Sequence, residues 1–189
     1  MAKIKWKGGA LLAPVPPAMV TCSDGEKDNI ITIAWTGIVN TNPPKTYISV
    51  RPSRHSYEMI KKSGVFAINL TTEELVRAAD WCGVYTGAKV DKFAKCKLSR
   101  EAATEIDCPI IAESPLSLEC RVTDIIPMGT HHMFLADIVA VDVDEIIFEG
   151  TMKGFVVLTI NADYSYEDAP RVTPPNDAYN YVTRSYYVY

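Results

Sequence analysis

The stretch Thr46–Leu70 reads TYISV, then RPSRHSYEMIKKSG, then VFAINL, and it decides the fold. The first and last pieces are rich in β-branched and aromatic residues, so each predicts a strand. In the middle piece the pattern changes to helical spacing, with Ser53 as a typical N-cap and Gly64 suited to end a helix. The stretch therefore predicts a strand over 46–50, a helix over 53–62 and a strand over 65–70.

Alternating sequence on both sides of this stretch predicts more strands. Before it lie a Pro-containing edge strand, a second strand and a Gly/Asn/Pro-rich loop, at Leu11–Cys22, Asn29–Trp35 and Thr36–Lys45. After it lie two long strands and a last short one, at Leu116–Ile126, Met133–Val143 and Phe155–Ile160. Thr71 and Glu74 form a capping box for a helix through about Trp81, and an irregular basic segment follows over Cys82–Arg100.

These elements amount to about seven strands, mostly joined by short connections, with two or three short helices between them. This order favours a mainly antiparallel β-barrel of the Greek-key type with peripheral helices over a doubly wound parallel sheet. A chain of 189 residues is long enough for one domain with a tail. Its 48% hydrophobic and 22% charged residues exclude a disordered or collagen-like protein.

The composition also indicates the cellular compartment in which the protein is expected. The apolar runs are shorter than the roughly 20 residues of a membrane span, and the basic, Pro-rich start does not resemble a signal peptide. We therefore expect a cytoplasmic protein with no membrane partner. The five cysteines contain no CxxC pair, which excludes a zinc ribbon and favours idle thiols in a reducing compartment.

The charge is unevenly distributed along the chain. The net charge of −4 argues against a nucleic-acid partner. Between Lys45 and Arg100, however, the chain has eleven basic and five acidic residues, so the net charge of this segment is +6 and that of the remainder is −10. A compact positive segment of this kind favours a small anionic ligand.

The sharpest candidate site is Arg51-Pro52-Ser53-Arg54-His55-Ser56, at a predicted strand end that opens a helix. Free N–H groups at a helix N-terminus, serine hydroxyls and arginine forks all suit a phosphate. A capped surface helix with two solvated arginines is the alternative. Lys92, in the irregular basic segment, either reaches the same phosphate or belongs to a solvated loop.

Two further segments could contact a flat ligand. Trp35-Thr36-Gly37 ends a strand, where backbone groups could meet a heteroaromatic ring; a buried tryptophan before a turn is the alternative. His131 and His132 precede a strand, so one should face inward and one outward. A histidine here is either structural or lies beside a cofactor, and a metal role for the pair is remote. The chain has no GxGxxG, Walker, GxSxG or HExxH motif, so redox chemistry would need a bound cofactor.

Taken together, these segments resemble the flavin reductase-like proteins with an FMN-binding split barrel, and flavoredoxin-type members in particular. The matching segments occur in family order at Pro14-x-Pro16, Asn29…Trp35-Thr36-Gly37, Val50–Tyr57, Gly64–Leu70, Val90–Phe93 and Gly129–His131.

The resemblance implies a homodimer that holds FMN noncovalently near the subunit interface. It implies no metal. It implies that His131 is the catalytic residue, placed where nicotinamide or another substrate stacks. The cofactor-binding residues that it implies are Trp35, Thr36, Gly37, Ile38, Arg51, Ser53, Arg54, His55, Ser56 and Lys92.

The resemblance also divides the chain. Residues 1–162 are expected to form the FMN-binding split-barrel domain. Residues 163–189 hold seven of the ten tyrosines and are expected to form an extension that packs on the barrel or on the partner subunit.

The function implied is an FMN-dependent oxidoreductase that takes electrons from NAD(P)H and gives them to a flavin, a ferric complex, a disulfide or a redox protein. One alternative is an FMN-binding electron carrier without NAD(P)H activity. A split-barrel binding module without flavin is another.

Overall fold

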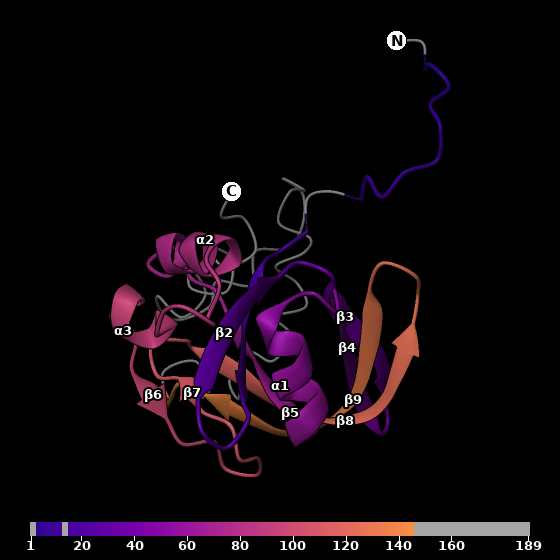
Figure 1. The fold of residues 1–189 in the computed structure, drawn as a ribbon. Coiled ribbons are helices and arrows are strands. Elements are labelled where there is room, and N and C mark those ends of the chain that lie inside the picture. Colours follow the sequence, from indigo (N-terminus) through magenta and orange to yellow (C-terminus); the bar gives the residue numbers. More distant parts are fainter. Residues whose placement is uncertain (1–2, 13–14, 146–189) are drawn as a thin grey trace, which may run out of the picture.

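The structure, a computed structural model, describes residues 3–12 and 15–145 (Figure 1). The predicted strand Phe155–Ile160 and the extension 163–189 lie outside the described residues. Seven strands form one antiparallel sheet in the order β2-β1-β5-β8-β9-β4-β3. Their bounds are β1 (Ala18–Ser23), β2 (Asp28–Ile33), β3 (Thr36–Thr41), β4 (Pro44–Val50), β5 (Val65–Leu70), β8 (Leu116–Pro127) and β9 (His132–Val143). The prediction of a mainly antiparallel β protein is confirmed.

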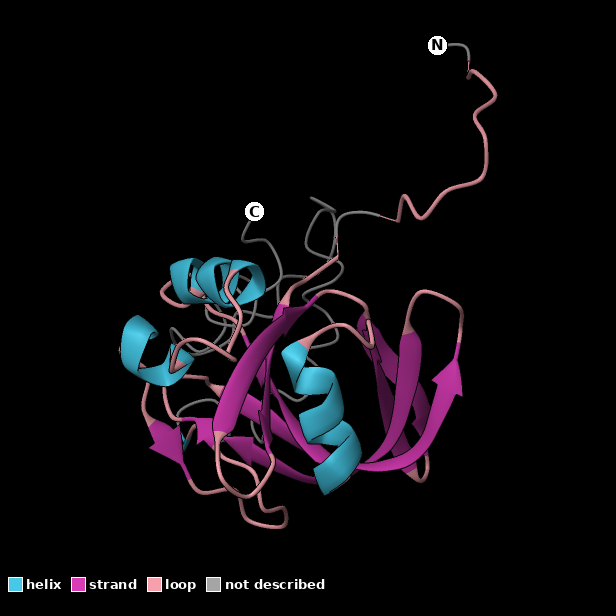
Figure 2. Cartoon of the chain, in the orientation of Figure 1, coloured by secondary structure: helices cyan, strands magenta, loops and turns pink. Residues whose placement is uncertain are grey.

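The sheet curls into a split barrel, with helix α1 (His55–Ser63) in the opening between β2 and β4 in this view (Figure 2). Just after β2 the chain joins the other end of the sheet, where the carbonyl oxygen of Trp35 accepts a hydrogen bond of 3.0 Å from the N–H of Ser49 and continues the β3–β4 ladder. β2 itself contacts β4. Helix α1 connects β4 to β5, which are separated in the sheet by β8 and β9. The chain therefore crosses over in the Greek-key manner, as predicted, and α1 packs against β1, β2 and β5.

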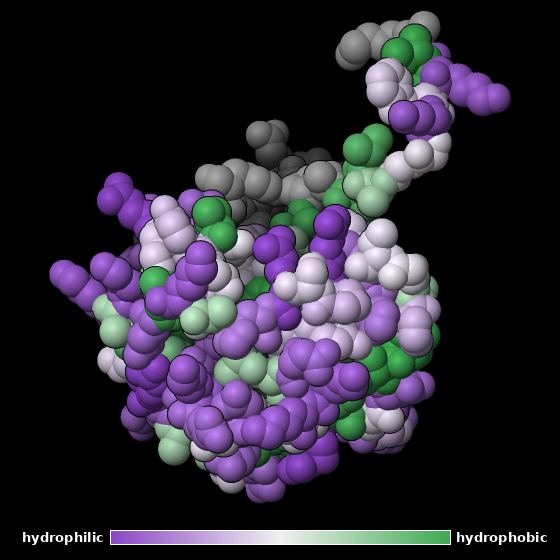
Figure 3. Space-filling view, in the orientation of Figure 1, coloured by the Kyte–Doolittle hydropathy of each residue, from purple (hydrophilic) through white to green (hydrophobic). Residues whose placement is uncertain are grey.

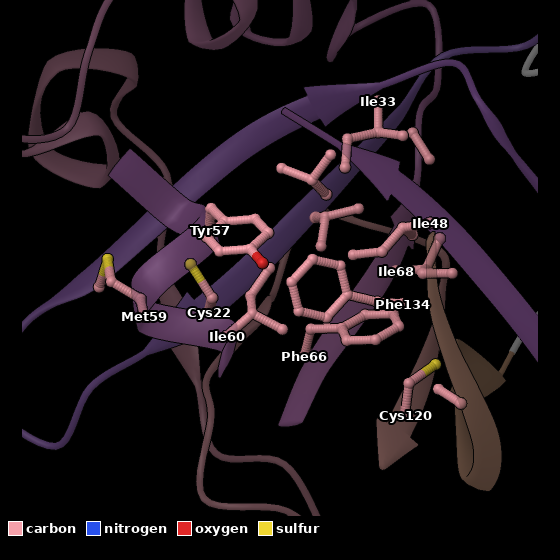
Figure 4. Packing of buried hydrophobic residues seen from close by; sticks show 14 residues of the cluster. Cys22, Ile33, Ile48, Tyr57, Met59, Ile60, Phe66, Ile68, Cys120 and Phe134 are labelled. Atoms are coloured by element: carbon pink, nitrogen blue, oxygen red, sulfur yellow. The ribbon is translucent and has the colours of Figure 1, made fainter. Parts of the chain in front are cut away.

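Three apolar clusters hold the described part of the fold together, the smallest of them around Val65 and Ala67 of β5. The barrel interior is filled from strands and from α1, with Phe66, Phe134 and Ile60 fully buried (Figure 4). On the other side of β1 and β2, Met19 and Ile30 pack against α2 (Val76–Val84) and α3 (Lys92–Cys96). Because β1 is covered on both faces, all six of its residues are buried.

The described surface is otherwise largely hydrophilic on the face shown in Figure 3. Residues 3–12 extend away from the barrel (Figure 1). In the described part of the chain, no helix has the length and apolar character that a bilayer crossing requires.

Several predicted strand boundaries were wrong, each for a local reason. The loop expected over Thr36–Lys45 is a β-hairpin, because Asn42 and Pro43 make the turn and leave β-branched residues to pair on either side. The strand expected from Leu11 begins at Ala18 instead, after the prolines, which cannot donate to a ladder.

Two predicted helix starts were also wrong. The N-cap of α1 is Arg54, not Ser53, because a turn closed by Arg54 N–H to the Arg51 carbonyl comes first. The predicted capping box does not open α2; a turn from Thr72 to Leu75 precedes a helix that begins at Val76. The segment expected to be irregular contains α3 and the short strand β6 (Arg100–Glu101), which pairs with β7 (Ile110–Ile111).

Candidate functional site

Three adjoining hollows lie where the end of β2, the end of β4 and the start of α1 meet. The α1 hollow has a volume of about 160 Å³, the middle hollow about 190 Å³ and the Trp35 hollow about 520 Å³. Ile31, Thr32 and Arg54 line both of the first two, while Trp35, Ser49 and His131 are among the residues that line both of the last two. The three hollows therefore form one groove, which we call the site groove.

The N-terminus of α1 forms one end of this groove. Ser53, Arg54, His55 and Ser56 all line the α1 hollow, so the structure brings these four predicted residues together. No side chain caps α1, which leaves its first N–H groups and its positive dipole end for a ligand. The arrangement suits an anion such as a phosphate.

Lys92 lines the same hollow and is almost fully buried, with 4% of its surface exposed. Its Nζ donates hydrogen bonds to the carbonyl oxygens of Ile30 at 2.6 Å and Cys82 at 2.7 Å. Both acceptors are neutral, so they orient the ammonium without cancelling its charge. Burial lowers the pKa of Lys92 from its ordinary value. An anion in this hollow would be stabilised by Lys92 and would favour its charged form.

Two groups in the α1 hollow are absent from the predicted site residues. Asn29 is buried and donates a 2.8 Å hydrogen bond from Nδ2 to the Ser56 hydroxyl, while its Oδ1 is one of the few buried side-chain oxygens in the described residues with no hydrogen-bond partner. Gly87 packs so closely that a Cβ there would lie 2.0 Å from that Oδ1. The signal that could have revealed Asn29 is an asparagine inside a strand that otherwise continues as the mainly β-branched run of residues 30–33.

Trp35 and His131 form the other end of the site groove. Their ring centroids are 4.7 Å apart with the planes tilted by 44°, and Trp35 is 46% exposed. Arg51 lines the middle hollow and its Nε donates to His131 Nε2 at 3.3 Å. The predicted residues Trp35, Arg51 and His131 therefore lie together.

The contacts of His131 define its protonation. Because Arg51 can only donate, Nε2 must accept, and the proton of a neutral ring then lies on Nδ1, 3.0 Å from the Thr130 hydroxyl. Partial burial, followed by the positive charges of Arg51 and Arg54, lowers the pKa of His131. Both effects favour the neutral imidazole of His131 beside Trp35.

The remaining predicted cofactor residues lie on β3. Thr36 lines the Trp35 hollow, and its hydroxyl donates to the Tyr47 carbonyl at 2.6 Å. Gly37 and Ile38 line none of the three hollows; the Gly37 carbonyl accepts from the Thr46 hydroxyl, and Ile38 is 61% exposed. A role for Gly37 and Ile38 in cofactor binding stays a prediction.

The second histidine points the other way, as the alternation predicted. His132 Nδ1 lies 2.7 Å from the Tyr57 hydroxyl, on the side of the barrel core. His131 and His132 therefore do not converge on a common point, and within the described ranges no group of three or more His, Cys, Asp or Glu side chains is placed to hold a metal ion.

Comparison with known proteins identifies the family of this chain. Residues 11–164 match the flavin reductase like domain family. Among solved structures, the chain is similar to the flavoredoxin of Desulfovibrio vulgaris (Miyazaki F), with a TM-score of 0.72 and 31% identity over 77% of this chain and 79% of that one.

Two curated relatives extend the comparison. A protein of Archaeoglobus fulgidus is 30% identical over 116 residues, which cover 61% of this chain. The NADH-dependent FMN reductase AsuE2 of Streptomyces nodosus is 29% identical over 125 residues, which cover 66% of this chain. The matched region is 66% of the length of each relative, so the chain spans just under two thirds of either. With a family match over most of its length and the split-barrel fold described above, this chain belongs to the flavin reductase-like domain family.

Proposed function

We propose that this protein is an FMN-dependent oxidoreductase that passes electrons from NAD(P)H to an acceptor. The observation that carries the proposal is the site groove. Its α1 end is positively charged and suits an anion, and its other end has an exposed tryptophan and a neutral histidine. A ligand with a phosphate at one end and a flat ring system at the other matches this order of groups.

The residues present fit FMN. The N-terminus of α1, Arg54 and Lys92 would hold the phosphate, because each presents positive charge or free N–H groups to the α1 hollow. The unpartnered Asn29 Oδ1 would accept a hydrogen bond from a ribityl hydroxyl. Trp35 and Thr36 would border the ring system, since both line the Trp35 hollow. When bound, FMN supplies the chemistry by accepting a hydride and passing on electrons.

The chain's own residues would position the co-substrate. Arg51 holds His131 neutral and oriented, so His131 presents a flat uncharged face next to Trp35. The Trp35 hollow, at about 520 Å³, has the size of small-molecule sites, which measure roughly 300–1,000 Å³. We assign His131 the role of contacting nicotinamide or another substrate there. Use of NAD(P)H is supported by the NADH-dependent relative.

The first experiment is the visible spectrum of the purified protein, followed by rapid mixing with NADH and with NADPH. We expect flavin absorption, and bleaching of it at catalytic rates by at least one nicotinamide. In His131→Ala, bleaching should slow by at least about tenfold while FMN affinity changes less than about threefold, because His131 contacts the co-substrate rather than the phosphate end.

Other outcomes would contradict the proposal in distinct ways. Bleaching only by reduced partner proteins would support an electron carrier, the alternative that the similarity to a flavoredoxin favours. A colourless protein that takes up no added FMN would leave a binding module without flavin.

We also propose that the protein is a homodimer with the site groove near the interface. Large apolar side chains stand exposed in the Trp35 hollow and along β3: Trp35 and Met128 line the hollow, and Ile38 and Val39 follow it on β3. Exposed apolar surface commonly marks a protein interface. The same surface is the natural approach for a small-molecule acceptor or a redox protein.

A further inference from the structure

Cys82 and Cys96 form a thiol pair next to the α1 hollow. Cys82 is in α2, is 1% exposed and lines the hollow, while Cys96 is the last residue of α3 and is partly exposed. Their sulfur atoms lie 3.8 Å apart. This is a van der Waals contact, and a disulfide bond needs the atoms about 1.8 Å closer.

Cys82 and Cys96 flank residues 83–95, which form one wall of the α1 hollow. The residues between them include Gly83, Thr86, Gly87 and Lys92, all of which line the α1 hollow. The carbonyl of Cys82 is also one of the two acceptors that hold the Lys92 ammonium. A bond between Cys82 and Cys96 would therefore act on the position of this wall and of its buried cation.

We propose that Cys82 and Cys96 form a reversible disulfide that weakens binding of the FMN phosphate. The second half of this proposal rests on the proposed function, whereas formation of the disulfide does not.

The oxidant is a low-molecular-weight disulfide. The Cys96 thiolate attacks one of its sulfur atoms, which forms a mixed disulfide and releases one thiolate. Cys82 then attacks the Cys96 sulfur, which forms the Cys82–Cys96 bond and releases the second thiolate, and the protons lost by the two cysteines end on the two released thiolates. Two protein thiols are oxidised and one small disulfide is reduced to two thiols.

The order of the two attacks follows from access. Cys96 is the thiol that solvent reaches, whereas burial, followed by the nearby Cys96, raises the pKa of Cys82 to about 12. Cys82 therefore acts second, on a sulfur already within contact distance. The five-residue helix α3 is held before Cys96 by the Asp91 N-cap and after Cys96 by ion pairs of Arg100 with Asp28 and Asp91, so the Cys82 side of the pair is the part that must adjust.

We expect weaker phosphate binding because the wall has no spare room. Gly87 is already in close contact with Asn29. If Cys82 shifts toward Cys96 and the wall moves with it, the contacts that shape the α1 hollow must therefore change. Loss of one well-aligned hydrogen bond to the phosphate would lower affinity by about fivefold.

The chemical test is oxidation of the full chain with oxidised glutathione, followed by a thiol titration under denaturing conditions and peptide mapping. The thiol count should fall from five to three, with one linked peptide that joins Cys82 to Cys96 and reverses with dithiothreitol. Cys96→Ser should lose this link, and Cys120→Ala, which removes a buried core thiol, should keep it. A stable glutathione adduct on Cys96, or five free thiols, would overturn the proposal.

The binding test compares FMN with riboflavin, which lacks the phosphate. The ratio of FMN affinity to riboflavin affinity should fall about fivefold on oxidation, and should not change in oxidised Cys96→Ser. An unchanged ratio in a protein that carries the link would overturn the coupling to the phosphate. If neither flavin binds, the proposed function fails while the disulfide result stands on its own.

Discussion

At the scale of single residues, the site groove has no room for a side chain at Gly87, which lies against Asn29. An added Cβ would lie 2.0 Å from Oδ1 and 2.4 Å from Cγ of Asn29, a separation that real atoms do not adopt. Asn29 cannot yield easily, because it is buried and bonded to Ser56. The absence of a side chain at position 87 therefore decides whether the α1 hollow can keep its shape.

We predict that Gly87→Ala lowers FMN affinity by at least about tenfold, because Asn29 and the wall must separate and their polar groups lose alignment. Isothermal titration with FMN measures the change. Gly8→Ala, at a glycine whose added Cβ meets nothing within 4 Å, is the matched control and should bind like the wild type. If Gly87→Ala and the wild type bound FMN equally well, the phosphate would have to bind outside the α1 hollow.

At the scale of elements, a loop is attached to the barrel by one buried carboxylate. Glu119 of β8 accepts hydrogen bonds from the backbone N–H groups of Thr104 at 2.6 Å, Glu105 at 2.8 Å and Ile106 at 3.0 Å. Burial alone would raise the pKa of Glu119, but these N–H groups lower it overall. The ionised form therefore stabilises the attachment of residues 104–106 to β8.

We predict that Glu119→Gln lowers the free energy of unfolding by about 2–4 kcal/mol, because an amide offers one neutral acceptor in place of two charged oxygens. Urea denaturation near neutral pH measures this loss. Glu26→Gln, at an exposed position, should stay within about 0.5 kcal/mol of the wild type.

The free energies of unfolding of the wild type and of Glu119→Gln should converge as the pH is lowered. A carboxylate whose pKa is lowered on folding contributes its full stability when the pH is above its ordinary pKa. This contribution is lost as the pH falls through the pKa of the folded state. Asp142, whose pKa is raised by burial and then by Glu119, contributes in the opposite sense. The comparison is therefore made in an Asp142→Asn background, where a gap that stays constant down to about pH 3 would contradict the assignment.

Elements with strong local signals could be predicted from the sequence, and those set by their neighbours could not. β5 has the predicted bounds, and β8 and β9 differ from theirs by one residue each, because their alternation is strong. β3 has an Asn, a Gly and a bulge, and only pairing with β4 makes it a strand. α3 has five residues, too few for a periodic signal.

The candidate site shows the same division. Ser53, Arg54, His55 and Ser56 are adjacent in sequence, so local reasoning could group them. Asn29 and Gly87 reach the α1 hollow from a strand and a distant loop, and no local pattern joins them. Likewise, Trp35 lies beside His131 only because β4 pairs with β3 on one side and with β9 on the other.

At the scale of the whole molecule, the proposed homodimer makes the surface beside the site groove an interface. Val39 lies in the bulge of β3, an edge strand, and is 49% exposed. We predict that Val39→Lys converts the dimer to a monomer, because burying an ammonium there costs more than the apolar contact provides. Light scattering after size exclusion measures the mass.

Val141→Lys is the matched control for this variant. Val141 is 51% exposed at the end of β9 that does not pair with β4, so its replacement should leave a dimer intact. A wild-type chain that is monomeric at micromolar concentration would contradict the homodimer.

The buried ammonium of Lys92 also bears on how much of this protein a cell can hold. A buried charge whose hydrogen-bond acceptors are two neutral carbonyls makes the ligand-free chain less stable than its packing alone would allow. A bound anion removes that deficit and adds its own binding free energy to folding. Newly synthesised chains would thus accumulate in step with the supply of their ligand, and chains that never meet it would be the first that proteases remove.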